Sequence, residues 1–409
     1  MTRSLWRHAD FLRLWSAQAV SAFGSRITRE GLPLAAVLTL DATPVQLGIL
    51  AALGYGPGLV IGLFAGGWAD RHRRRPLLIG SDLARMVLLL SIPLAAWSGL
   101  LAMGQLYVVA ALVGAASVVF DIADHGYLPG LIDRDQLLEG NSKLAVTDSV
   151  AEVGGPALAG LLFQLLTAPI ALVVNAATYA VSAVLLLAIR RPEPPVEIKP
   201  GQRHPLSDLL FGLRAIGDQP LVRPLLGAAL LQGLFGAFFA ALYMLFAIQT
   251  LKIAPALLGL IIAMGGVGAL AGALLARLAT RRLGPGRAIV IMGGTGALSL
   301  MLVPLAPAGP VSGPAFLIAA QLIGDAFMVA AIIPAVTLRQ SLFPQSMLGR
   351  TSAVFHVAAG ATMVVGALVG GALGQVLGVR EALWIGAAGV LAGPLLLRFS
   401  PLWRQRALL

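Results

Sequence analysis

Twelve long apolar runs, separated by short polar segments, constrain the fold of this chain more than any other feature. An α-helix needs about 20 apolar residues to cross roughly 30 Å of hydrocarbon, and most of these runs reach that length. Of the 409 residues, 58% are hydrophobic and only 11% are charged. The runs lack the alternation of barrel strands, so the sequence predicts an all-α membrane protein. The predicted spans are residues 12–38, 46–68, 76–98, 104–128, 144–166, 168–189, 222–248, 255–279, 287–306, 314–337, 352–376 and 381–399.

A polar, proline-rich segment divides these spans into two sets of six. It begins with Arg-Arg-Pro-Glu-Pro-Pro at residues 190–195, a composition typical of a linker. Within it, residues 205–218 are predicted to form a short amphipathic helix on the membrane surface. The predicted domains are an N-terminal six-helix bundle, a cytoplasmic linker and a C-terminal six-helix bundle, at residues 1–190, 191–221 and 222–409 respectively.

The two halves also echo one another in sequence. Gly114 in the fourth span and Gly324 in the tenth are separated by the same distance as Gly160 in the fifth and Gly370 in the eleventh. Internal repeats of this kind are common in secondary transporters. The chain is therefore expected to consist of two pseudo-symmetric bundles.

Lysine and arginine gather in alternate loops, which sets the orientation of the chain in the membrane. Basic residues are retained on the cytoplasmic side, and their distribution here places both termini in the cytoplasm, with the chain in the cell (inner) membrane. The net charge of +11 is spread over short loops that face anionic lipid, so nucleic-acid binding is not expected. The chain has no cysteine, which excludes a disulfide framework and thiol catalysis.

The tight basic loop between the second and third spans carries a family resemblance. Gly66, Asp70, Arg71 and Arg74 fit the pattern G-x-x-x-D-R-x-x-R-R, which resembles the corresponding loop of the major facilitator superfamily of secondary transporters. The chain departs from this family by carrying Arg73 where relatives usually carry glycine.

This resemblance implies a twelve-helix fold and a cytoplasmic gate. The gate would consist of the four loop residues named above together with Asp121 of the fourth span, and it would latch the cytoplasmic side in the outward-facing state. The alternative is a loop that only fixes membrane topology.

Two further segments are similar to the bacterial drug and siderophore exporters of this superfamily, of the macrolide and enterobactin type. The segment from Phe120 to Pro129 resembles the end of helix 4 in that branch, but it carries the acidic Asp124 where relatives have arginine. Gly155, Pro156 and Gly160 are similar to the antiporter motif G-P-x-x-G-G. The resemblance implies export of a small amphipathic compound by proton antiport. Uptake of a nutrient, or translocation of a lipid such as a lysophospholipid, is the alternative.

Charged residues inside the spans are the candidates for coupling, because each costs at least about 2.5 kcal/mol to insert. Glu30, Glu152 and Asp325 are the predicted proton-coupling carboxylates. Arg26 and Glu30 are four residues apart, so we expect them to pair. A static ion pair near the outer interface is an equal alternative for Glu30, and Asp325 has no obvious partner in its own helix.

Polar residues at middle depth complete the candidate site. A cavity role and an interhelical contact are equally expected for the neutral ones. Asp82 and Arg85, three residues apart in the third span, are expected to form a structural pair instead. The candidate cavity and substrate residues are Arg26, Arg29, Asp124, Asn175, Gln232 and Gln321.

Several functions are excluded by missing motifs. The sequence has no G-x-x-x-x-G-K-[ST] phosphate loop, no visible catalytic constellation, and five histidines that lack the spacing of a metal site. We therefore expect a non-enzymatic carrier without cofactor or metal. Its expected partners are a small-molecule substrate, protons and membrane lipid, and we expect it to be a monomer.

Overall fold

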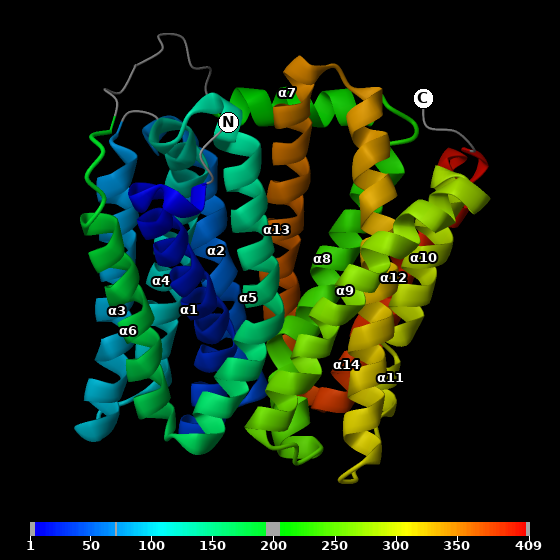
Figure 1. Ribbon diagram of the computed structural model, residues 1–409. Coiled ribbons are helices and arrows are strands. Elements are labelled where there is room, and N and C mark those ends of the chain that lie inside the picture. The colour runs from blue at the N-terminus through cyan, green and yellow to red at the C-terminus, as the bar shows by residue number, and fades with distance from the viewer. Residues whose placement is uncertain (1–4, 70–71, 194–204, 406–409) are drawn as a thin grey trace. The chain divides into compact units, whose positions relative to one another are not determined.

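The computed structural model of the chain describes residues 5–69, 72–193 and 205–405. The fold consists of twelve membrane-spanning helices in two six-helix bundles, as predicted (Figure 1). The helices of the first bundle are α1 (Ala9–Leu40), α2 (Pro44–Ala69), α3 (Arg74–Trp97), α4 (Met103–Leu131), α5 (Leu137–Leu165) and α6 (Ala168–Leu187).

The second bundle contains six further long helices. The shorter α7 (Pro205–Gly217) precedes it, a π-helical turn (Phe246–Thr250) extends α8, and the single turn α11 (Leu302–Leu305) follows α10. The long helices are α8 (Arg223–Leu245), α9 (Pro255–Leu283), α10 (Pro285–Ser299), α12 (Ser312–Leu342), α13 (Gln345–Val376) and α14 (Val379–Arg398).

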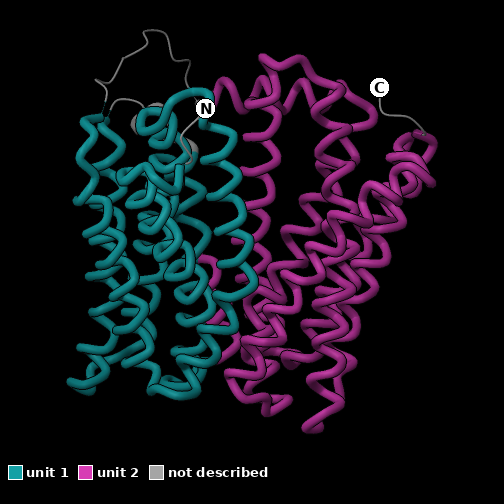
Figure 2. The backbone as a smooth tube through the Cα atoms, in the orientation of Figure 1, with its two compact units in different colours: residues 1–42, 53–202 teal, residues 43–52, 203–409 magenta. Residues whose placement is uncertain are grey.

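The chain forms two compact units, Met1–Ala42 with Leu53–Gln202, and Thr43–Ala52 with Arg203–Leu409 (Figure 2). The second unit thus includes the first turns of α2. There Gly48 lies so close to α13 that a Cβ atom at Gly48 would be 2.9 Å from the Cα atom of Gly371.

The same neighbour pattern occurs in both bundles. In the first, α1 packs on α5 and α6, and α3 packs on α4 and α6. In the second, α8 packs on α13 and α14, and α10 packs on α12 and α14. Gly114 and Gly324 therefore lie on equivalent helices, α4 and α12, and Gly160 and Gly370 lie on α5 and α13.

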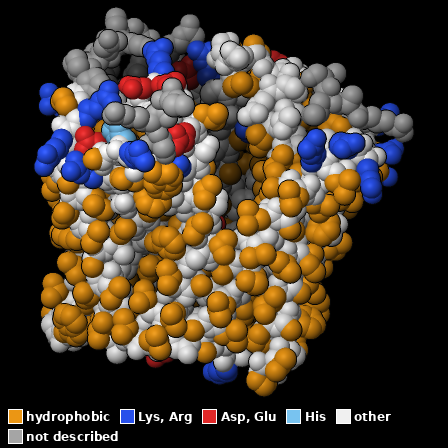
Figure 3. All heavy atoms as spheres, in the orientation of Figure 1, with side chains coloured by type: hydrophobic (Ala, Val, Ile, Leu, Met, Phe, Trp, Pro, Cys, Tyr) orange, Lys and Arg blue, Asp and Glu red, His pale blue; other side chains and the backbone are white. Residues whose placement is uncertain are grey.

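Ten helices in the described part of the chain are long and apolar enough to cross a membrane by length and composition alone. On the face shown in Figure 3, hydrophobic side chains cover most of the first unit, and charged side chains gather toward one end. The two bundle helices outside the group of ten are α1 and α5, whose charged residues lower their hydropathy. These are the helices that carry the candidate site.

Two helices begin a full seven residues earlier than their hydropathy predicted. α5 begins at Leu137 rather than residue 144, and α13 begins at Gln345 rather than residue 352. Both extensions are rich in polar residues, so hydropathy marks only the apolar part of each helix.

The predicted linker helix is present as α7, and it packs on the start of α13. A salt bridge of 2.9 Å joins Asp208 to the Nε atom of Arg350, and the guanidinium of Arg350 lies 5.1 Å from the ring centre of Phe211. Ile216 of α7 is buried in a cluster with Val354 of α13. Because α7 is fixed by ionic, aromatic and apolar contacts, it is a packed element of the second unit.

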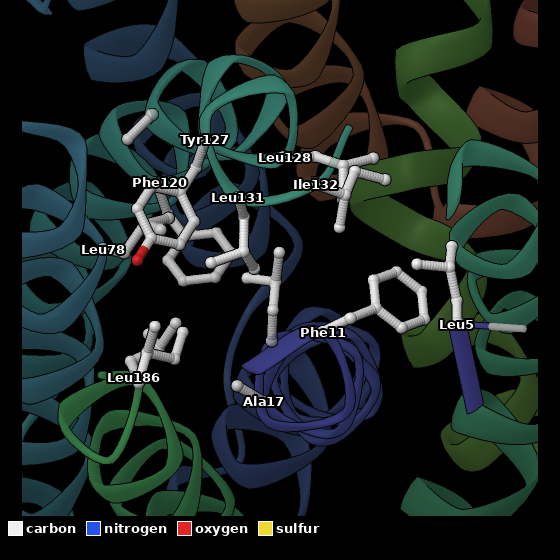
Figure 4. Packing of buried hydrophobic residues seen from close by; sticks show 13 residues of the cluster. Leu5, Phe11, Ala17, Leu78, Phe120, Tyr127, Leu128, Leu131, Ile132 and Leu186 are labelled. Carbon is white, nitrogen blue, oxygen red and sulfur yellow. The ribbon is translucent and has the colours of Figure 1, made fainter. Parts of the chain in front are cut away.

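One end of the first bundle has a well-packed apolar core (Figure 4). Phe11 of α1 and Tyr127 of α4 are buried in it, as is Leu186 at the end of α6. The van der Waals contacts among these side chains fix the helix ends against one another.

Candidate functional site

A cluster of four charged side chains joins α1 to α5 within the first unit. Glu152 of α5 accepts from two arginines of α1: its Oε2 atom lies 2.8 Å from Nη2 of Arg26, and its Oε1 atom lies 2.9 Å from Nη2 of Arg29. The Nε atom of Arg29 also lies 3.1 Å from Oε1 of Glu30. Positive and negative groups therefore alternate through the cluster, and the four charges cancel when both carboxyls are ionised.

The pairing within this cluster corrects one expectation. Arg26 and Glu30 were expected to pair because they are four residues apart, but Arg26 pairs with Glu152 and Glu30 pairs with its neighbour Arg29. The reason is that α5 packs directly on α1, which brings a carboxylate from another helix within reach of both arginines.

Exposure distinguishes the two carboxylates of the cluster. The side chain of Glu152 is 43% exposed, whereas that of Glu30 is 15% exposed. Glu152 is therefore much less enclosed by protein than Glu30.

The glycine motif of α5 lies directly beside this cluster. Gly155 is buried against the stem of Arg26, and a Cβ atom at Gly155 would lie 3.0 Å or less from two carbon atoms of that side chain. Pro156 and Gly160, the other motif residues, are also buried. The absence of a side chain at Gly155 is thus what allows α1 and α5 to approach closely at the ion cluster.

A second charged pair lies fully buried between α1, α3, α4 and α6. Asp82 and Arg85 form the predicted salt bridge, with 2.6 Å between Oδ1 and Nη2. The guanidinium lies 4.4 Å from the ring centre of Phe120 and 4.5 Å from that of Tyr179, and it also donates to the hydroxyl of Ser21 at 3.2 Å. Four helices therefore contribute to this pair, which identifies it as a structural element of the first unit.

The acidic residues of α4 have different environments. Asp124 accepts a hydrogen bond from the side-chain amide of Gln18 on α1. Asp121 is exposed, and its backbone carbonyl lies 2.6 Å from Nδ1 of His125. Asp148 of α5 is within electrostatic range of both aspartates.

The basic loop before α3 is held by hydrogen bonds. Glu193 accepts from the backbone amides of Arg74 and Arg75, and the Arg75 guanidinium donates to the last two carbonyls of α6 at 3.0 and 2.7 Å. The Arg74 guanidinium lies against Gly126 of α4. Arg73, where relatives have glycine, precedes α3 with an ordinary extended backbone (φ −63°), so no glycine is needed there.

The other gate residues are only partly covered by the structure. Gly66 lies in the last turns of α2, whereas Asp70 and Arg71 lie outside the described residues. The predicted latch between this loop and Asp121 therefore stays a prediction.

The remaining candidates are distributed over both units. Asn175 is fully buried and donates to the hydroxyl of Thr28 at 2.7 Å, which is an interhelical contact between α6 and α1. In the second unit, Asp325 and Gln321 of α12 lie against Gly265 of α9, and Gln232 is a half-buried residue of α8.

Sequence reasoning missed a polar stripe on α1. Gln18, Ser21, Ser25 and Thr28 follow the 3–4–3 spacing of one helix face, and each hydrogen-bonds to another helix of the first unit. The helical periodicity of small polar residues was the signal that would have identified this face. The stripe binds the Asp82–Arg85 pair, Asn175 and Asp124, while the cluster of Arg26 and Arg29 lies beside it.

Comparisons with known proteins decide the family. Residues 14–324 match the family model described as Major Facilitator Superfamily. The chain is a member of the major facilitator superfamily. Together with the long apolar helices of its described part, this membership makes the chain a multi-pass membrane protein.

Relatives of known sequence leave the substrate open. The chain is 25% identical over 192 residues to the "uncharacterized MFS-type transporter YfiS" of Bacillus subtilis, covering 47% of this chain and 45% of the relative. It is 30% identical over 233 residues to an uncharacterized MFS-type transporter of Mycobacterium tuberculosis, covering 56% and 48% of the two chains. The chain thus matches about half the length of these relatives.

Solved structures share the fold across almost the whole chain. A bacterial homologue of the iron transporter ferroportin, in an inward-facing state, matches with a TM-score of 0.76 and 17% identity over 97% of this chain and 98% of its own. The nucleoside transporter NupG matches with a TM-score of 0.76 and 12% identity over 95% and 98%. At these identities the likeness establishes the superfamily fold alone.

Proposed function

We propose that this protein is a proton-coupled secondary transporter for a small amphipathic compound, working by alternating access of its two six-helix bundles. The observation that supports this function is Glu152, a half-exposed carboxylate held between Arg26 and Arg29 in the membrane-spanning part of the first unit. In this proposal the bundles are residues 1–190 and 222–409, residues 191–221 form the linker, and both termini are cytoplasmic in the cell (inner) membrane.

The setting of Glu152 is that of a charged group in a transport pathway. Charged groups inside the membrane are retained where they serve a transport pathway, and their protonation depends on the neighbouring charges and on access to water. Glu152 has two cationic neighbours and is accessible, whereas Glu30 is more deeply buried beside Arg29. Glu152 is therefore the proposed coupling residue, with Glu30 and Asp325 as the other candidates.

Export by proton antiport is supported by the resemblance to the exporter branch. The motif glycine Gly155 lies against Arg26, so the motif itself supports the ion cluster. In antiport, substrate and proton occupy the site in alternate half-cycles.

Proton-coupled co-movement is the second candidate, and it includes uptake of a nutrient or translocation of a lipid. The favouring observation is that Glu152 neutralises two arginines. Once it takes a proton, these arginines attract an anion, so that proton and substrate bind in the same half-cycle.

The gate is proposed on the cytoplasmic side of the first unit. Gly66, Asp70, Arg71 and Arg74 of the loop, together with Asp121 of α4, would latch that side when the transporter opens outward. In support, the Arg74 guanidinium already lies on α4, the helix that carries Asp121.

Everted membrane vesicles with an imposed proton gradient test the function. A panel of drugs, siderophores and small nutrients is screened for movement that depends on both the protein and the gradient. Glu152→Gln is expected to keep counterflow, which needs no net proton movement, and to lose gradient-driven transport. Glu139→Gln is the matched control, because Glu139 lies on the same helix and pairs with Lys143 at 3.1 Å.

Two results would contradict the proposal. Gradient-driven transport by Glu152→Gln at the wild-type rate would show that another group carries the proton. Loss of counterflow together with gradient-driven transport, in a folded variant, would assign Glu152 to binding alone.

A further inference from the structure

We infer that Arg26 and Arg29 are the recognition site for an anionic group of the substrate, and that Glu152 occupies this site as a resident anion when substrate is absent. This inference rests on the second candidate function, proton-coupled co-movement, in which Glu152 takes the coupling proton. It assigns the substrate class as a small amphipathic anion, bearing a carboxylate, phosphate or sulfonate.

The geometry of the ion cluster is that of an anion site already filled. The two oxygen atoms of Glu152 contact different guanidiniums, at 2.8 Å from Arg26 and 2.9 Å from Arg29. The arginines are three residues apart on α1 and so project from adjacent turns on one side of the helix. Carboxylate, phosphate and sulfonate groups present oxygen atoms that guanidiniums bind in the same way.

Accessibility and unused donors favour an exchangeable anion over a static pair. The side chains of Arg26 and Arg29 are 32% and 39% exposed, in contrast to the buried pair of Asp82 and Arg85. Among the described residues, the Nε atom of Arg26 is buried without a hydrogen-bond partner. An incoming anion therefore finds two partly exposed guanidiniums, and the buried Nε of Arg26 is a donor that Glu152 leaves unused.

The charge balance of the cluster links binding of the substrate anion to protonation of Glu152. The groups around Glu152 are Arg26, Arg29 and Glu30 from α1 and Asp148 from its own helix, while Tyr55 of α2 is within electrostatic range of Arg29 and Glu30. When Glu152 takes a proton from water, Arg29 keeps its ion pair with Glu30, whereas Arg26 loses its ion pair and keeps only the longer-range attraction of carboxylates such as Glu30, Asp148 and Asp121. Binding of a monoanion then restores the original charge. The site therefore takes up one proton with each anion.

The sign of coupling follows from this balance. Because proton and anion occupy the site together, they cross the membrane in the same direction. The proton gradient would drive accumulation inward, whereas a compound made in the cell would leave with a proton down its own concentration gradient. This prediction differs from antiport, in which proton and substrate move in opposite directions.

Calorimetric titration of the purified full-length chain tests the inference. Hexanesulfonate is a suitable probe because it is permanently anionic and carries no proton of its own. Hexyltrimethylammonium and 1-hexanol are the cationic and neutral probes of matched chain length. Repeating the titration in buffers of different ionisation enthalpy gives the number of protons taken up per bound ligand.

We expect only the sulfonate to bind, with one proton taken up per anion. For a reaction linked to one proton, the Kd should rise about tenfold for each unit by which the pH increases. Glu152→Gln should bind hexanesulfonate without proton uptake and with a Kd that no longer varies with pH. Arg26→Gln and Arg29→Gln should each raise the Kd at least about tenfold, the change expected when a charge-assisted hydrogen bond is lost.

Arg13→Gln is the matched control, because Arg13 is on the same helix and pairs with Asp10 at 2.6 Å; its Kd should be unchanged. The inference is overturned if the cation binds as tightly as the sulfonate, if no sulfonate binds, or if wild-type binding takes up no proton. The anion site and the proposed transport function can fail independently. If the titration refutes the anion site, Glu152→Gln can still uncouple transport of a cationic or neutral compound in the vesicle assay, and the proposed function then stands. The wild-type proton count does not depend on the folding of any variant.

Discussion

Replacing Arg85 with methionine should destabilise the first unit more than any substitution of an exposed charge. Arg85→Met removes the 2.6 Å ion pair with Asp82, the hydrogen bond to Ser21, and the stacking on Phe120 and Tyr179. The largest loss comes from the carboxylate of Asp82, which is completely buried and would keep hydroxyl neighbours but no cationic partner within salt-bridge distance among the described residues. Breaking a buried pair in this way costs about 3–5 kcal/mol.

The double variant Asp82→Leu/Arg85→Met separates this orphaned charge from the loss of packing. It should recover most of the lost stability, because neither charge then remains buried without a partner. The free energy of unfolding is measured by titration with dodecyl sulfate in mixed micelles, as a double-mutant cycle. Arg13→Met is the control, since its partly exposed pair should contribute about 1 kcal/mol or less. A single variant within about 1 kcal/mol of wild type, or a double variant no better than the single, would refute this explanation.

Three other substitutions in the first unit, two of them with a matched control, test the packing beside the ion cluster, the capping of α6 and the proposed gate. Gly155→Ala should lower transport because its methyl group would press on the ion cluster, whereas Gly80→Ala, with nothing within 4 Å, should leave transport unchanged in the same vesicle assay. Arg75→Ala should destabilise the protein by about 1.5–3 kcal/mol, because the hydrogen bonds to α6 are lost. Arg73→Ala is the control: Arg73 is exposed, so its loss should cost less than about 0.5 kcal/mol in the same unfolding measurement in micelles. Asp70→Asn should reduce turnover without reducing insertion into the membrane, and wild-type turnover would refute the latch.

The sequence predicted the twelve helices because hydropathy is a local property of each span. It also predicted the pair of Asp82 and Arg85, because both partners lie on one helix three residues apart. It did not predict that Glu152 binds Arg26, because that contact depends on how α5 packs on α1. The capping of α6 by Arg75 was missed for the same reason: a loop arginine cannot be matched to a distant helix end from spacing alone.

The two polar faces of α1 support the proposed exchange of anions at the ion cluster. One face is fixed: Ser21 and Thr28 bind groups buried between α3 and α6. The other face presents Arg26 and Arg29 to Glu152, which is partly exposed. The hydrogen bonds of the first face fix α1 in place. We therefore expect the two guanidiniums to keep their spacing when Glu152 moves away, so that an incoming anion does not have to order them. Preorganised donors of this kind bind more tightly than flexible ones, since less conformational entropy is lost on binding.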